Sequence, residues 1–120
     1  MFAFLSNALR GGDMTAAEAL PLVASGEIVL IDIRDPMEIR ASGMAEGAVS
    51  IPSATLAMRA DPRSPECLDA LKAGKPIAVY CASGARSAMA KGLLQRMGHE
   101  EVHNIGGLGH WQAAGGKIVR

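Results

Sequence analysis

The chain has 120 residues, enough for one domain with its own apolar core but too few for two. Lysine plus arginine number 12 and so do aspartate plus glutamate, so no net charge would draw the chain to nucleic acid or to an anionic membrane. Two cysteines exclude a disulfide framework, and without a C-x-x-C pair they do not indicate zinc or thioredoxin chemistry.

The opening decapeptide, MFAFLSNALR, has neither a basic start nor a long apolar centre. We therefore expect no secretory signal and no membrane span, and a cytoplasmic protein. Phe2, Leu5 and Leu9 could share one face of a short helix, which we expect to pack on the domain rather than to anchor the chain at a membrane surface. Cys67 and Cys81 could form a single bridge, but in a reducing compartment we expect free thiols.

Two capping boxes predict helix starts in the first part of the chain. Thr15 with Glu18, and Asp35 with Glu38, each have the spacing in which a side chain caps the first turn and an acid reaches back. The sequence thus predicts one helix over 16–25 and a short one that begins at residue 36. Between them EIVLID is a continuous apolar run, typical of a strand covered on both faces.

The later elements follow the same alternation. We expect, in order, a strand at AVSIP, a helical turn within 53–63, a helix over 64–73, a strand at IAVY, a helix at SAMAKGLLQRM, a strand at EVHNI, and a turn with a short helix at GGLGHWQAAG. The helix at SAMAKGLLQRM should bury one face, opposite Lys91 and Gln95, that consists of Met89, Ala90, Leu93, Leu94 and Met97.

Strands that alternate with helices predict an α/β fold, with an open, mostly parallel sheet and helices on both faces. In such sheets functional sites form beyond the carboxyl ends of the strands. Cys81 comes directly after the strand IAVY and so lies at that edge.

The loop CASGAR between this strand and the next helix carries the strongest chemical signal. A tight arc of small residues can turn successive backbone N–H groups inward to form an anion site, and Gly84 permits the positive φ that this needs. The following helix start adds positive potential, and Arg86 offers a forked guanidinium to sulfonate, phosphate or carboxylate. These features favour a thiolate at Cys81, so we predict a nucleophile rather than a small buried thiol. The predicted substrate-binding residues are Ala82, Ser83, Gly84, Ala85, Arg86 and Ser87.

CASGARS resembles the active-site loop of the rhodanese-type sulfurtransferases, and the resemblance extends from about Met14 to Gly115. LIDIRDPMEIRASG is similar to the family's strand with its Asp-x-Arg and following acid, GMAEGAVSIP to its Gly-His-Ile-x-Gly-Ala block, and NIGGLGHW to its Gly-Gly-x-x-x-Trp ending. Met44 stands where the family usually has histidine, so any polar role there is lost. The resemblance implies a rhodanese-like domain over 14–120, after an N-terminal extension over 1–13.

The resemblance implies sulfur transfer without a metal or organic cofactor. Cys81 would take sulfur from a small donor such as thiosulfate or a polysulfide, and pass it to a thiol or cyanide. Cysteine phosphatases, some of which share the fold, have five residues between cysteine and arginine, whereas four separate Cys81 from Arg86. A phosphatase or arsenate-type enzyme is therefore the second hypothesis, and a sulfur-relay module with a protein acceptor is the third.

Several other polar residues have a structural reading that we prefer. HEEVH has the spacing of a zinc-protease motif, but His99 and His103 would need a helix and EVHNI indicates a strand. Asp32 and Arg34 could be catalytic, although an ion pair that fixes the next loop is the better interpretation. Cys67 could resolve a persulfide, but we expect it to pack in a helix. Trp111 should pack the final helix, and His110 could lie at the rim of the site.

Overall fold

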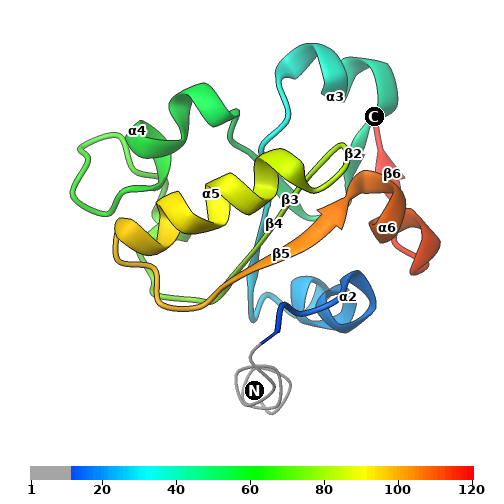
Figure 1. Ribbon diagram of the computed structural model, residues 1–120, viewed down its shortest axis with the longest axis horizontal. Coiled ribbons are helices and arrows are strands. Elements are labelled where there is room, and N and C mark those ends of the chain that lie inside the picture. The colour runs from blue at the N-terminus through cyan, green and yellow to red at the C-terminus, as the bar shows by residue number, and fades with distance from the viewer. Residues whose placement is uncertain (1–11) are drawn as a thin grey trace.

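Four parallel strands form the central sheet of the computed structural model, which describes residues 12–120, in the order β3-β1-β4-β5 (Figure 1). The strands are β1 Val29–Asp32, β3 Ala48–Ser50, β4 Ile77–Cys81 and β5 Val102–Gly107. Every residue of β1 and β4 is buried, as their apolar runs predict for central strands with both faces covered. The expected α/β fold with a mostly parallel sheet is confirmed.

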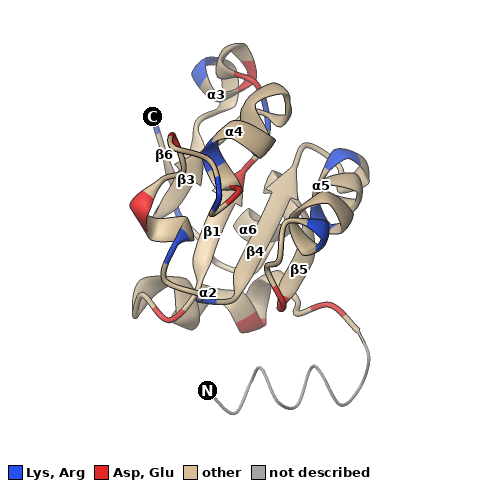
Figure 2. Cartoon of the chain, turned by 90° about the vertical axis from the view of Figure 1, so that its left-hand side faces the viewer, with Lys and Arg blue, Asp and Glu red and all other residues tan. Residues whose placement is uncertain are grey.

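Helices cover both faces of this sheet (Figure 2). The side chains between the helices and the sheet form two apolar cores. Helices α4 Leu56–Ala60 and α5 Ala85–Arg96 pack on one face, and α2 Ala16–Ala24 and α6 Leu108–Ala113 pack on the other. Trp111 is buried in the second core, where its indole N–H donates to the Lys117 carbonyl at 3.1 Å. Its predicted packing role is confirmed.

Local capping fixes where the first helices begin. The Thr15 hydroxyl accepts from the Glu18 amide at 3.1 Å, and Glu18 accepts from the Thr15 amide at 2.9 Å, so the first capping box forms as predicted. At α3 Pro36–Ser42 the Asp35 amide donates to Glu38 Oε1 at 3.2 Å. This bond orients the Glu38 carboxylate at the helix start.

The expected helix over 64–73 is wrong. The segment forms turns and one 3₁₀ turn, Asp69–Leu71, because the Leu68 amide donates to the Arg59 carbonyl at 2.9 Å and ties the chain back to α4. This path still buries Cys67 and Leu71 in the core. The helical turn expected within 53–63 is confirmed as the 3₁₀ turn Ser53–Thr55 followed by α4.

The expected inward position of Met89 is also wrong, since 78 % of that residue is exposed. The buried stripe of α5 consists of Ser87, Ala90 and Leu94, at spacings of three and four residues. Met89 precedes Ala90 by one residue and is rotated about 100° from it. It therefore faces solvent beside Leu56 and Arg86.

A small antiparallel sheet, not expected from the sequence, joins β2 Met44–Ala45 to β6 Ile118–Val119. Met44 pairs with Val119, so the position where the family has histidine lies in this backbone pairing. Within residues 12–120 no helix has the length and apolarity to cross a membrane. The expected face of Phe2, Leu5 and Leu9 lies outside the described residues.

Candidate active site

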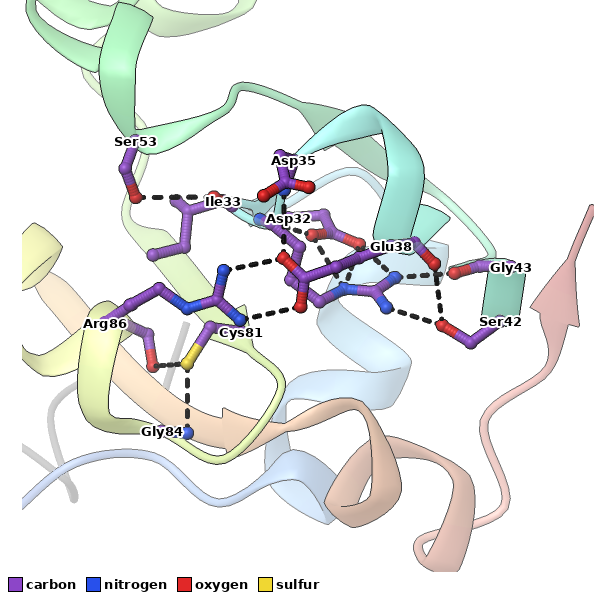
Figure 3. Close-up of polar contacts among 12 residues, drawn as sticks. Asp32, Ile33, Asp35, Glu38, Ser42, Gly43, Ser53, Cys81, Gly84 and Arg86 are labelled. Atoms are coloured by element: carbon purple, nitrogen blue, oxygen red, sulfur yellow. Dashed lines mark hydrogen bonds and ion pairs between the residues drawn. The ribbon is translucent and has the colours of Figure 1, made fainter. Parts of the chain in front are cut away.

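Cys81 is the last residue of β4, at the carboxyl edge of the sheet (Figure 3). Helix α5 begins four residues later at Ala85, with Gly84 as its N-cap at a φ of 106°. An L side chain rarely adopts this backbone conformation, so glycine makes the reversal from strand to helix possible. The residues between them therefore curl around the Cys81 side chain.

Hydrogen bonds hold the sulfur of Cys81 within this loop. The Gly84 amide donates to Sγ at 3.0 Å, and Ser87 Oγ lies 3.4 Å from Sγ. Burial acts to raise the pKa of Cys81, but the Ser87 hydroxyl and the amides of Ser87, Gly84 and Ser83 lower it to about 7. Roughly half of the thiol is thus ionised at neutral pH, as expected for a nucleophilic cysteine.

The side chain of Cys81 is fully buried, whereas Ala82 and Ser83 beside it are exposed. One side of the sulfur belongs to the core that contains Ala90 and Leu94, and the loop amides face the other. Ala82 and Ala85 contribute small side chains, and their amides donate no hydrogen bond to Sγ in the described structure. Reaction at Cys81 therefore requires a local displacement that admits the reagent.

Asn104, which was not among the predicted site residues, holds the loop in place through hydrogen bonds from β5. Its side-chain amide donates to the Gly84 carbonyl at 3.1 Å, and its Oδ1 accepts from Ser87 Oγ at 2.7 Å and from the Gly106 amide at 3.0 Å. These bonds fix both groups that contact the sulfur, Gly84 and Ser87. The one sequence signal was a polar residue within the strand EVHNI.

Arg86 does not offer a free guanidinium to the loop. Its Nη1 and Nη2 donate to Glu38 Oε1 and Oε2 at 2.7 and 2.8 Å (Figure 3). The hydrogen bonds from Arg86 hold the pKa of Glu38 at about 2, so the carboxylate is charged at neutral pH. The sequence assigned Glu38 to capping alone, but it reaches the loop as well.

Asp32 and Arg34 form the buried ion pair that we preferred over a catalytic role. Arg34 Nη2 lies 2.8 Å from Asp32 Oδ2, and the same guanidinium donates to the Gly43 carbonyl and to Ser42 Oγ. The Tyr80 hydroxyl also donates a hydrogen bond to Asp32 Oδ2, at 2.5 Å. The cluster joins β1, β4 and the end of α3, and so holds Glu38 on a fixed element.

The chain packs closely where β5 passes the loop. A Cβ on Gly107 would collide with the Ala82 carbonyl, and one on Gly84 would lie 3.3 Å from Gly106 Cα. The Gly107 amide donates to Nδ1 of His110 at 2.9 Å, so the exposed His110 side chain rests on this part of the backbone. Glycine at position 107 is therefore required for β5 to lie against the loop, whereas position 84 needs glycine chiefly for its positive φ.

The histidines of HEEVH do not share a site. His103 is in β5, as the strand pattern predicted, with Nδ1 bonded to the Met14 amide and Nε2 to Glu101. His99 bonds instead to the Ala60 carbonyl, and residues 12–120 hold no cluster of three potential metal ligands. Cys67 is a free buried thiol whose pKa is raised by burial, opposite to the shift of Cys81.

Comparison with known proteins gives a consistent result. The family model described as Rhodanese-like domain matches residues 15–114. A sulfurtransferase of Allochromatium vinosum is 32% identical over 99 residues, which cover 82% of this chain and 84% of that protein. The thiosulfate sulfurtransferase PspE of Escherichia coli is 35% identical over 78 residues, 65% of this chain and 68% of that protein.

Two solved structures add the fold and an alternative chemistry. The human single-domain sulfurtransferase TSTD1 superposes with a TM-score of 0.66 at 27% identity, covering 84% of this chain and 95% of that one. A Rhodopseudomonas palustris protein of unknown function, described as a possible tyrosine phosphatase, superposes with a TM-score of 0.78 at 38% identity, covering 97% and 91%.

Proposed function

We propose that this chain, which belongs to the rhodanese-like domain family, carries sulfur as a persulfide on Cys81. Its relatives indicate a sulfurtransferase-type enzyme. The donor is a small sulfane-sulfur compound such as thiosulfate or a polysulfide, and the acceptor is a thiol or cyanide. The observation that carries the proposal is the pairing of the Gly84 amide with Cys81 Sγ at 3.0 Å in a loop that brings the pKa of the thiol to about 7.

The reaction has two half-reactions. The Cys81 thiolate attacks the outer sulfur of thiosulfate, a new S–S bond forms, and the bond to the sulfonate sulfur breaks with its electron pair leaving on sulfite. An acceptor thiolate then attacks the outer sulfur of the persulfide, and the Cys81 thiolate departs. The loop amides and the Ser87 hydroxyl stabilise the anionic sulfur in both steps, and alternation of the two enzyme forms predicts ping-pong kinetics.

The direct test is the mass of the intact protein after incubation with thiosulfate or polysulfide. The wild type should gain one sulfur atom, an acceptor thiol should remove it, and Cys81→Ser should gain nothing. Cys67→Ala should behave as the wild type, because Cys67 is buried outside the loop and its pKa is raised. An unmodified wild type with every donor would refute the proposal.

A cysteine phosphatase is the second candidate, favoured by the description of the Rhodopseudomonas palustris structure. Two features oppose it: only four residues separate Cys81 from Arg86, and Arg86 is paired with Glu38 rather than free for phosphoryl oxygens. Hydrolysis of an aryl phosphate that is lost in Cys81→Ser would support the phosphatase.

A sulfur-relay role is tested at the second half-reaction. Persulfidated protein should transfer sulfur to small thiols and to cyanide if it is a general sulfurtransferase. Transfer that is slow to every small acceptor but fast to one protein thiol would instead assign the relay role.

A further inference from the structure

The pairing of Arg86 with Glu38 changes the charge that a sulfur donor meets at the loop. Arg86 is the one cationic side chain within CASGARS, and both of its terminal nitrogens are bonded to the Glu38 carboxylate. A bidentate pair of this length is the strongest arrangement that the two groups can make, and it carries no net charge. Apart from the Cys81 thiolate, the donor therefore approaches loop side chains that are neutral overall.

The remaining positive potential at the loop comes from backbone amides that already stabilise the Cys81 sulfur. The amides of Ser83, Gly84 and Ser87 stabilise the thiolate of Cys81. The hydrogen bonds to Glu38 are the main cause of the raised pKa of Arg86, and the Cys81 thiolate adds to it, so the guanidinium lies within the electrostatic reach of the thiolate. A donor with two negative charges would be repelled by the thiolate, and Arg86, neutralised by Glu38, would not offset that repulsion. A neutral or singly charged donor would lose little binding energy to this repulsion.

From this geometry we infer that Glu38 is a specificity-determining residue, which neutralises Arg86 beside Cys81 and so selects against dianionic donors in favour of donors of low charge, such as organic hydropersulfides. The inference rests on the proposed function for its biological meaning. Thiosulfate, a dianion, then acts as a donor of high KM.

Three substitutions separate charge from structure. Glu38→Gln removes the negative charge but keeps an oxygen that can accept from the Asp35 amide and from Arg86. Arg86→Gln does the opposite, since it leaves the Glu38 charge unbalanced. Glu46→Gln is the matched control, because it makes the same chemical change at an exposed position in the turn between β2 and β3.

The first readout does not depend on sulfur transfer. It is the ratio of alkylation rates at Cys81 for anionic iodoacetate and neutral iodoacetamide, followed by peptide mass mapping so that Cys67 is scored separately. The ratio cancels any change in thiolate fraction. It should rise about fivefold in Glu38→Gln, which corresponds to about 1 kcal/mol for one unit charge, and should fall in Arg86→Gln. Glu46→Gln should leave it unchanged.

The second readout is the KM for sulfur donors of different charge. Glu38→Gln should lower the KM for thiosulfate by about tenfold or more, because a dianion feels the charge twice. It should lower the KM for an organic hydropersulfide, whose sulfur carries at most one negative charge, by a smaller factor. Increasing salt should shrink the difference between the variants.

Opposite shifts of the alkylation ratio in the two loop variants support the inference. An unchanged ratio in Glu38→Gln, or shifts in the same direction in both variants, would overturn it and leave Glu38 as a cap alone. Should Glu38→Gln not fold, Arg86→Gln decides, since its ratio must fall. If the ratios shift as expected but no donor forms a persulfide, the proposed function fails while the charge selection at Cys81 stands.

Discussion

Removal of the Ser87 hydroxyl should change the reactivity of Cys81 in opposite directions at low and at high pH. Ser87 Oγ lies 3.4 Å from Sγ and from the Gly106 carbonyl but only 2.7 Å from Asn104 Oδ1, so its one proton has three candidate acceptors. A hydrogen bond to a charged group contributes about 1.5–3 kcal/mol, and a long shared bond belongs at the low end. Since one pKa unit is 1.36 kcal/mol, Ser87→Ala should raise the pKa of Cys81 from about 7 by about one unit.

The rate of alkylation by iodoacetamide follows from this shift. At pH 6 the variant has about one tenth of the thiolate, but each thiolate is about threefold more nucleophilic because its pKa is higher. The variant should therefore react about threefold more slowly than the wild type at pH 6 and about threefold faster at pH 9.5, with the two profiles crossing between pH 7 and pH 8.

The assay is a series of stopped-flow alkylation rates in the Cys67→Ala background, with Ser87→Cys excluded because it adds a thiol. Ser87→Thr is the matched control, since it keeps a hydroxyl at the same position. Profiles of Ser87→Ala and the wild type that share one midpoint would refute the assignment of Ser87 as a donor to the thiolate, and a midpoint that moves down would show that the hydroxyl accepts from the thiol.

Three further outcomes are expected. Tyr80→Phe removes the hydroxyl that joins Asp32 Oδ2 at 2.5 Å to the Ala45 amide at 2.9 Å. The substitution should lower the free energy of unfolding in urea by about 2 kcal/mol, while the alkylation rate of the folded protein stays within about twofold of the wild type. An unchanged stability would contradict the buried network. Gly107→Ala places a Cβ against the Ala82 carbonyl and should slow persulfide formation at least about tenfold. Gly109→Ala is the control, because its Cβ meets open space within α6, and it should add about 0.5–1 kcal/mol of stability without loss of rate. Equal rates in both variants would contradict the close approach of β5 to the loop. Persulfidated wild type should keep its extra sulfur as long as persulfidated Cys67→Ala, which has no second cysteine for an internal disulfide, as judged by the mass of the non-reduced protein. A sulfur loss that requires Cys67 would make it a resolving thiol.

The site elements that could be predicted from the sequence are those encoded within a few consecutive residues. A strand that ends at Cys81, a glycine with positive φ at position 84 and a helix start directly after it occur in one continuous run, so the direction of the loop amides follows from local backbone geometry. The ion pair of Asp32 with Arg34 is likewise local, since only Ile33 lies between its members.

The contacts that were missed join residues far apart in the chain. Glu38 and Arg86 are 48 residues apart, and Asn104 is 17 residues beyond Ser87. Glu38 already had a sufficient local explanation as a cap, and nothing in its neighbourhood indicates that the start of α3 faces the loop. Only the sheet order, which places β1 and β5 on either side of β4, brings these two side chains to Cys81.

The two wrong predictions about helices have a different cause, the competition between local propensity and tertiary contacts. Residues 64–73 have a helix-start signal and an end signal, but the Leu68 amide finds an acceptor on Arg59 and the turns bury Cys67 and Leu71 without a helix. For Met89 the hydrophobic pattern was too permissive: the face of α5 that packs on the sheet consists of Ser87, Ala90 and Leu94, and Met89 is rotated about 100° from Ala90 toward solvent.

A different competition, between burial and hydrogen bonds to the sulfur, sets the pKa of Cys81. Burial alone would raise the pKa of Cys81 above its ordinary value and make it as inert as Cys67, which lies in the same core. The difference between the two thiols is one of direction: the Cys81 sulfur faces the amides of a reversing loop and a helix start, while the Cys67 sulfur faces the Leu68 carbonyl, an acceptor that cannot stabilise a thiolate. Because a thiol attacks disulfide sulfur fastest when its pKa is near the ambient pH, the pKa of about 7 that results from burial on one side and three amides and one hydroxyl on the other would suit Cys81 to attack sulfur.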